Sequence, residues 1–208
     1  MTIRMDTKPE RYIKLNNAQK YDTKIKTDGV RSISHFLELS ALKRALANIR
    51  GNSVLDAPCG TGRIDLLLHE RFPKVIGLDS SEAMLTVYRG KEHIRTGLLG
   101  DIFRLPFKND SFDWVVCHRL FHHFNTDELR LSLLKSIAQT AKNGVVFYSW
   151  VKTPLAHRES SRRVTVDLCQ IKKLINEAGL VLESVRYAFW PFQPKAILVC
   201  RKRPPLNE

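Results

Sequence analysis

One short stretch constrains the fold more than any other part of the chain. Residues 54–63 read Val-Leu-Asp-Ala-Pro-Cys-Gly-Thr-Gly-Arg, an apolar run that ends on Asp56 and then passes through Gly60 and Gly62. An apolar helix pattern begins directly afterwards. Glycines in a strand–loop–helix unit let the backbone approach a bound molecule closely. The stretch therefore predicts a buried strand, a binding loop and a helix in direct succession.

The rest of the chain repeats this alternation of strand and helix patterns. Its order predicts a parallel, doubly wound sheet with right-handed crossovers. The last two strand patterns are joined by a short loop, so they must pair antiparallel. We therefore expect an α/β protein with a mostly parallel, seven-stranded Rossmann-like sheet and a final antiparallel strand pair. The strands after the first are expected at 75–79, 94–99, 112–117, 144–148, 181–187 and 196–200.

Length and composition indicate one domain after an N-terminal segment. The chain has 208 residues, 43% of them hydrophobic, which suits a single sizeable core. Residues 1–34 are polar and are predicted to form an arm or lid, and residues 35–208 the domain. No apolar run is long enough for a membrane span, and the first residues lack a signal-peptide core. The four cysteines are scattered, so we expect no metal site and a reduced, cytoplasmic protein.

The net charge of +13 is the second informative quantity. A positive field attracts anions and raises the rate of encounter with them. The charge fits a protein whose substrate is an anion, such as nucleic acid, a phosphorylated sugar or lipid, or a small acid. It also fits an ordinary basic protein with no such ligand. The charge alone does not choose among these.

The order of residues in the glycine loop separates two cofactor classes. The pattern D-x-x-x-G-x-G, with acids at the ends of the next two strands, resembles motif I of the class I S-adenosylmethionine-dependent methyltransferases. The segment after 117 resembles the small bacterial, ubiquinone-biosynthesis-like branch. Pro58 departs from the family pattern, which often has glycine there. A dinucleotide loop would need glycine at position 65, where Asp65 stands, and no phosphate-binding P-loop occurs.

The resemblance implies S-adenosylmethionine as cofactor and a role for each matching residue. Asp56 would accept from the cationic amino group, and Asp79 from the ribose hydroxyls. Asp101 and Ile102 would recognise adenine, and Cys117 would offer its carbonyl to the methionine end. The complete expected cofactor set is Asp56, Ala57, Pro58, Gly60, Gly62, Arg63, Asp79, Ser80, Met84, Asp101, Ile102 and Cys117.

The acceptor side is expected in less regular segments. His122 is the first candidate general base and His118 the second. The arginines expected to bind an anionic acceptor are Arg119, Arg158 and Arg162. Tyr21 and Arg31 in the arm are candidates to close over the methionine carboxylate.

Three functions remain open from the sequence. The first is methyl transfer to oxygen or nitrogen of a small or lipid-linked, anionic acceptor. The second is methylation of rRNA or tRNA, which the charge motivates, although the motif of base-amino methyltransferases is absent after residue 117. The third is a non-catalytic protein that binds S-adenosylmethionine. Cys117 follows an apolar strand, which disfavours a nucleophilic cysteine.

Overall fold

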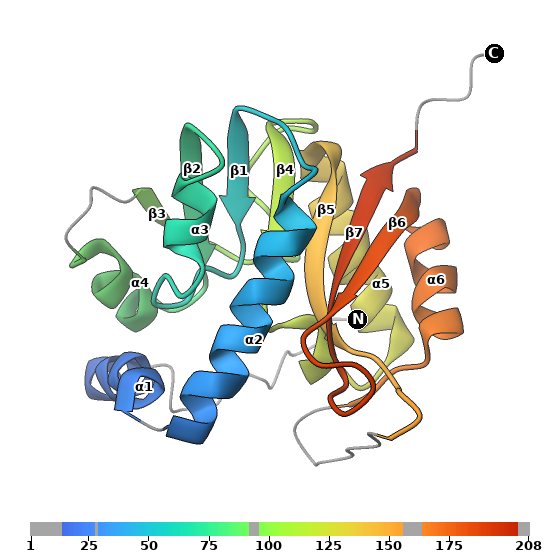
Figure 1. Ribbon diagram of the computed structural model, residues 1–208. Coiled ribbons are helices and arrows are strands. Elements are labelled where there is room, and N and C mark those ends of the chain that lie inside the picture. Colours follow the sequence, from blue (N-terminus) through green and yellow to red (C-terminus); the bar gives the residue numbers. More distant parts are fainter. Residues whose placement is uncertain (1–13, 28, 92–95, 156–163, 204–208) are drawn as a thin grey trace.

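A seven-stranded sheet forms the centre of the protein, seen in a computed structural model that describes residues 14–27, 29–91, 96–155 and 164–203 (Figure 1). The strand order is β3-β2-β1-β4-β5-β7-β6. Strands β1 to β5 pair in parallel, and β7 runs antiparallel to both β5 and β6. The expected fold class and final antiparallel pair are confirmed. The strands are β1 (Ser53–Asp56), β2 (Lys74–Asp79), β3 (Thr96–Leu99), β4 (Phe112–Cys117), β5 (Ala141–Trp150), β6 (Leu180–Tyr187) and β7 (Lys195–Lys202).

Helices cover both faces of the sheet (Figure 1). Alternate residues of β4 show why: Trp114 and Val116 pack with α2, while Val115 and Cys117 pack with α5 and α6. Strands buried on both faces read as continuous apolar runs, which is the pattern in the sequence. The helices are α1 (Leu15–Thr27), α2 (Gly29–Leu46), α3 (Asp65–His69), α4 (Glu82–Arg89), the short 3-10 helix η2 (Phe121–His123), α5 (Asp127–Thr140) and α6 (Leu168–Glu177).

Side chains that accept hydrogen bonds from backbone N–H groups determine where α4, α5 and α6 begin. Ser81 accepts from the N–H of Met84 at the start of α4. Thr126 does the same for α5, and Asp167 for α6. Each supplies an acceptor to a donor that has no partner inside the helix.

The N-terminal segment is more regular than its sequence suggested. Residues 1–34 were expected to form an arm or lid, but α2 begins within them at Gly29, and α1 precedes it. Among the residues of α1 whose burial is described (15–23), Ala18 alone is fully buried, so the helix contributes little to the core. Asp22 and Lys91 form an ion pair at 2.9 Å that ties α1 to the segment after α4. Within the described part of the chain, no helix is long and apolar enough to cross a membrane.

Candidate cofactor and active site

The carboxyl ends of four parallel strands bring the predicted cofactor residues to one edge of the sheet. Asp56 ends β1, Asp79 ends β2, Asp101 follows β3 and Cys117 ends β4. Asp56 pairs in register with Val116, so it lies beside the end of β4. Ligands of open α/β sheets bind at this edge, outside the carboxyl ends of the strands.

The glycine loop has two glycines in the left-handed region, with φ of +55° at Gly60 and +78° at Gly62. A Cβ at Gly62 would lie 2.8 Å from Cδ2 of Tyr88, whereas a Cβ at Gly60 would meet nothing within 4 Å. Gly62 is therefore required by packing against Tyr88 as well as by its conformation. Gly60 instead faces open space at the edge where a ligand would approach.

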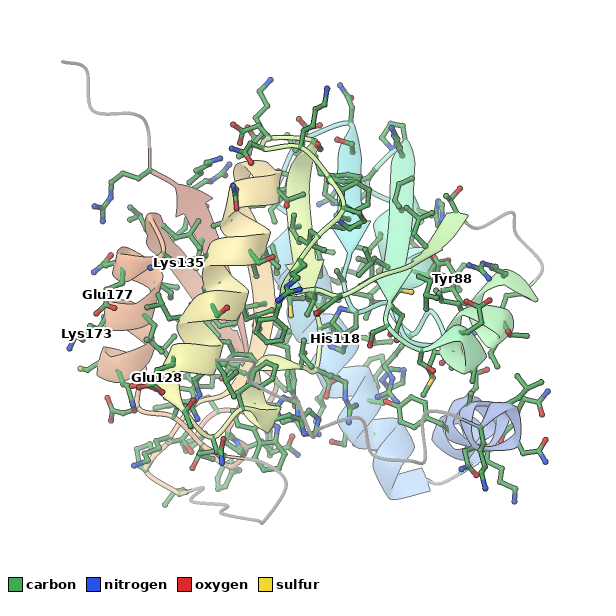
Figure 2. All side chains as sticks on the ribbon, turned by 180° about the vertical axis from the view of Figure 1, so that it is seen from behind. Tyr88, His118, Glu128, Lys135, Lys173 and Glu177 are labelled. Atoms are coloured by element: carbon green, nitrogen blue, oxygen red, sulfur yellow. The ribbon has the colours of Figure 1, made fainter. Side chains whose placement is uncertain are left out.

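Asp65, which replaces the third glycine of a dinucleotide loop, has a structural role. Its side chain is fully buried, and Oδ1 accepts a hydrogen bond of 2.8 Å from the hydroxyl of Tyr88. The pair fixes the ring that packs beneath Gly62. Figure 2 shows Tyr88 directed from α4 toward the sheet.

Asp56 is the most unusual carboxylate at this edge. It is fully buried, and neither carboxylate oxygen has a hydrogen-bond partner among the described residues. Burial raises the pKa of Asp56 well above its usual range, and the nearby Asp65 and Asp79 carboxylates raise it further. Buried polar atoms are normally paired, so two unpaired oxygens point to a missing donor. A cationic amino group fits both their charge and their number.

Asp79 joins the glycine loop to the start of α4. Oδ2 accepts from the N–H of Gly60 at 2.9 Å, and Oδ1 accepts from the N–H of Ser81 at 2.8 Å. A carboxylate oxygen can accept more than one hydrogen bond, so capacity for ribose hydroxyls remains. Next to Asp79, Ser80 is exposed and Met84 is buried.

The predicted adenine turn follows β3. The exposed Asp101 uses Oδ1 to accept from the N–H of Phe103 at 3.0 Å. Ile102 is buried, and its carbonyl accepts from the Ser136 hydroxyl at 2.6 Å, which anchors the turn to α5. Cys117 is fully buried, and burial raises the pKa of its thiol, which agrees with the expectation that this cysteine is not a nucleophile.

An acid that the sequence analysis did not single out lies at the centre of the acceptor side. Glu38 of α2 is 1% exposed, and its Oε1 lies 3.2 Å from Nε2 of His118 and 3.3 Å from Nη1 of Arg119. Its Oε2 lies 3.7 Å from Nζ of Lys195. Burial alone would raise the pKa of Glu38, but Arg119, His118 and Lys195 together hold that pKa well below its usual range. Glu38 is therefore an ionised carboxylate among three basic groups.

A signal for Glu38 was present in the sequence. Residues 35–39 read His-Phe-Leu-Glu-Leu, an acid inside an apolar helical run. A buried acid in such a run requires partners, which come from residues distant in sequence.

The two candidate bases are both buried. His118 is 7% exposed, and burial lowers its pKa more than Glu38 raises it, so the imidazole is neutral near pH 7. Figure 2 places His118 at the carboxyl end of β4. His122 is 1% exposed in η2, and its ring stacks on Trp150 with centroids 5.7 Å apart. It also lies edge-on to Tyr148 at 5.1 Å.

Two predicted arginines also lie at this edge. Arg119 has φ of +63°, a conformation uncommon outside glycine, and 24% of its side chain is exposed. The Arg63 guanidinium lies 5.2 Å from the ring centre of Tyr21, so α1 does reach the site. Nε of Arg63 is buried and has no hydrogen-bond partner in the described ranges. Arg158, Arg162 and the side chain of Arg31 lie outside the described residues.

A separate groove of about 580 Å³ lies elsewhere in the molecule. It runs between the segment Phe103–Asn109 and α5, where Figure 2 labels Glu128 and Lys135. None of the predicted cofactor or acceptor residues that the structure describes lines it. We therefore place the candidate site at the carboxyl edge of the sheet and not in this groove.

The fold and the edge residues are together those expected of a class I S-adenosylmethionine-dependent methyltransferase domain. Comparison with known proteins agrees with this: residues 54–144 match the family described as a methyltransferase domain. The matched segment begins at β1 and reaches into β5, so it contains every predicted cofactor residue. The family expected from the sequence is confirmed.

Relatives with assigned names act on different acceptors. The chain is 35% identical over 118 residues to demethylmenaquinone methyltransferase of Lactococcus lactis, covering 53% of this chain and 46% of that protein. It is 27% identical over 115 residues to tRNA (carboxymethyluridine(34)-5-O)-methyltransferase of Saccharomyces cerevisiae, covering 54% of this chain and 39% of that protein. The chain thus spans less than half the length of each of these relatives.

Solved structures support the fold over most of the chain. Magnesium protoporphyrin IX methyltransferase from Synechocystis PCC 6803, solved with bound S-adenosylhomocysteine, superposes with a TM-score of 0.71 at 19% identity. The superposition covers 88% of this chain and 94% of that one. At this identity the likeness concerns the fold.

Proposed function

We propose that the protein transfers a methyl group from S-adenosylmethionine to an oxygen or nitrogen atom of a small or lipid-linked, anionic acceptor. The observation that carries the proposal is Asp56, a fully buried carboxylate with two unpaired oxygens at the end of β1. The ammonium group of the cofactor supplies the charge and the donors that this carboxylate lacks. A buried acid without such a ligand costs stability and gives nothing in return.

The other edge residues suit the remaining parts of the cofactor. The open face of Gly60 admits a ligand against the backbone, and Asp79 retains acceptor capacity for ribose hydroxyls. Asp101 and Ile102 form the turn proposed for adenine. When bound, the cofactor supplies an electrophilic methyl group on a sulfonium, and the protein's part is to position the acceptor and exclude water.

Of the two candidate bases, His118 has the better-defined environment. The ionised Glu38, 3.2 Å from Nε2, favours the tautomer with its proton on Nε2 and leaves Nδ1 able to accept one. In general-base sites a carboxylate commonly orients a neutral histidine in this way. His122 remains a second candidate, and its stacking on Trp150 also suits a purely structural ring.

Basic groups around Glu38 favour an anionic acceptor. Arg119, Lys195 and Arg63 bring positive charge to the same edge as the methyl-transfer site, and Glu38 offsets only part of it. Guanidinium groups recognise carboxylates and phosphates through paired N–H donors. The relative that acts on demethylmenaquinone is consistent with a lipid-linked acceptor.

A tRNA acceptor is the second candidate, favoured by the net charge of +13 and by the yeast tRNA relative. Binding of this kind weakens steeply and log-linearly with salt because counterions are released. Retention of labelled tRNA at low salt, with such a slope, would favour this candidate over the first.

A single experiment tests the proposal and sorts the acceptors. The protein is incubated with a cell extract and tritiated S-adenosylmethionine, and the extract is then fractionated into lipid, nucleic acid, protein and small metabolites. The proposal expects label in the lipid or small-metabolite fraction. Label in RNA supports the second candidate. Measured cofactor binding with no transfer in any fraction overturns both and leaves a non-catalytic binding protein.

A further inference from the structure

The loop between β6 and β7 exposes three large aromatic side chains. Phe189, Trp190 and Phe192 are 48%, 53% and 57% exposed. Figure 1 shows the loop at the end of the molecule where β1 to β5 terminate, the same end as the start of α2. Clustered apolar side chains on a surface mark interaction sites more often than single ones do.

Backbone contacts hold the main chain of this loop in place. The N–H of Gln193 donates to the carbonyl of Phe189 at 2.9 Å, and the N–H of Val151 donates to the carbonyl of Pro194 at 2.7 Å. The Thr153 hydroxyl donates to the carbonyl of Pro191 at 2.6 Å. Docking a preformed loop costs little conformational entropy. The loop therefore presents its rings on a backbone that the fold already holds.

The rings within the loop are arranged in two pairs. Phe189 stacks on Phe192 with centroids 5.2 Å apart, and Trp190 packs against Tyr187 at 4.7 Å. Despite these contacts, Phe189, Trp190 and Phe192 each stay about half exposed. Tryptophan and other amphipathic aromatic rings favour the boundary between lipid headgroups and acyl chains.

Positive charge accompanies the aromatic rings. Arg186 is exposed near the end of β6, and Lys152 is exposed between the two residues that bond to the loop. The whole chain carries +13. Basic side chains beside inserted aromatic ones bind anionic bilayers, because headgroup attraction adds to apolar burial.

We propose that this aromatic loop, residues 187–193, docks the protein on the surface of an anionic lipid bilayer. Trp190 and Phe192 enter the boundary of the acyl chains, and Arg186 and Lys152 contact headgroup phosphates. The docked face is the edge that carries the candidate site. Docking needs no methyl transfer, so it stands or falls separately from the proposed function.

Tryptophan fluorescence gives a direct test, because the chain has three tryptophans and Trp114 and Trp150 are buried. Only Trp190 is exposed. The protein is titrated with vesicles of phosphatidylcholine alone and of phosphatidylcholine with phosphatidylglycerol in a ratio of about 3:1. We expect a blue shift of emission and co-sedimentation with the anionic vesicles, weakened at high salt as charge screening requires.

Matched variants locate the contact. Trp190→Ser combined with Phe192→Ser should lower the vesicle partition coefficient by at least about tenfold, since two apolar rings leave the lipid. Val181→Ser is the control, because Val181 is also exposed (46%) but lies at the other end of β6. Arg186→Glu should weaken binding to anionic vesicles, whereas Lys142→Glu, at the start of β5, should change it little.

Three results would overturn the proposal. The first is no binding of the wild type to anionic vesicles at low salt. The second is an equal loss of binding in the control and loop variants. The third is sedimentation showing a dimer that the loop variant alone disrupts, without vesicle binding, which would assign the loop to a second copy of this chain. Thermal unfolding and cofactor binding of each variant establish that it is folded.

Discussion

Glu38 and His118 form a buried pair that links α2 to the end of β4. Oε1 of Glu38 lies 3.2 Å from Nε2 of His118, and both side chains are at most 7% exposed. The two groups differ in charge. The basic neighbours of Glu38 hold its pKa well below the usual range, and burial lowers the pKa of the His118 imidazole. An ionised acid thus faces a neutral ring near pH 7. The first three predictions test this arrangement.

Glu38→Gln should lower the free energy of unfolding by about 2–3 kcal/mol, because Arg119, Lys195 and His118 lose their common anion in a buried setting. Urea unfolding near pH 7 measures the change. Glu183→Gln is the control: Glu183 pairs with Arg201 on the surface, where removal should cost less than about 1 kcal/mol. Equal midpoints for the two variants would contradict the buried network.

His118→Gln should reduce methyl-transfer turnover by about 10²-fold and leave cofactor affinity within about twofold, because a base acts in the chemical step and not in cofactor binding. His122→Gln is the paired variant. If His122 is structural, its change should lower stability through lost stacking on Trp150 while turnover per folded molecule stays near wild type. The reverse pattern would assign the base to His122, and no effect from either would show that the acceptor needs none.

Acid should destabilise the protein in a range set by His35. Burial, followed by Arg63, lowers the pKa of His35 to about 4, with Glu38, Arg119 and His118 also acting on it. Its ordinary pKa is about 6.5, so the unfolded state binds a proton first and stability falls as pH drops from about 6.5 toward 4. His35→Asn should flatten that slope in pH-dependent thermal unfolding, while leaving stability above pH 7 nearly unchanged. A slope as steep as in the wild type would reject the assignment.

The positions of the glycine loop and of β4 could be predicted from the sequence, because the features that locate them are local. Asp56, Gly60 and Gly62 lie within one strand–loop unit, and the six residues of β4 were expected with their observed bounds. Neighbouring residues and strand period determine such features. Burial on both faces made each strand a continuous apolar run that short-range patterns can detect.

The Glu38 network could not be predicted in the same way. Its members come from α2, the end of β4 and the start of β7, and they meet only because those strands and α2 pack together. The α1 helix was also missed, because most of its residues are polar and its position depends on contacts with α4, Lys91 and Arg63. An acid inside an apolar helical run marks Glu38 as a residue that needs partners, but no local pattern says which distant residues supply them.

Cofactor affinity should rise with pH because of Asp56. Its pKa is raised well above the usual range, so part of the free protein holds a proton that a cationic amino group displaces on binding. Affinity for S-adenosylmethionine therefore increases as pH rises toward that pKa, with proton release that calorimetry in two buffers detects. Asp56→Asn should weaken binding by at least about tenfold and abolish the proton release.

The same residue should reduce the stability of the cofactor-free protein. The pKa of Asp56 is higher in the folded protein than the value of about 3.9 in the unfolded chain. Its protonated form therefore contributes to the free energy of unfolding at low pH, and this contribution is lost as pH rises through the folded pKa. Asp56→Asn should therefore raise the free energy of unfolding at pH 7 by about 1–2 kcal/mol without cofactor. A less stable Asn variant at pH 7 would mean that Asp56 has a partner within the protein.

The two glycines of the binding loop should respond differently to alanine. Both have positive φ, so each change carries a conformational cost of about 1 kcal/mol. Gly62→Ala adds a clash, because its Cβ would lie 2.8 Å from the buried Tyr88 ring that Asp65 holds. We expect a total loss of about 2–4 kcal/mol in chemical unfolding. Gly60→Ala meets nothing within 4 Å and should lose only the conformational part.

Gly62→Ala should lose more stability than Gly60→Ala, but Gly60→Ala should lose more cofactor affinity when both variants are compared in their folded forms. The space beside Gly60 is where the ligand would contact the loop, so a methyl group there should weaken S-adenosylmethionine binding by about tenfold or more. Folded Gly62→Ala should bind more nearly like the wild type, because its added methyl points toward Tyr88 and away from the edge. Calorimetry at a temperature where both variants are folded separates the two effects. Unchanged affinity in Gly60→Ala would place the cofactor away from this loop and leave Asp56 as the geometric support for its proposed position.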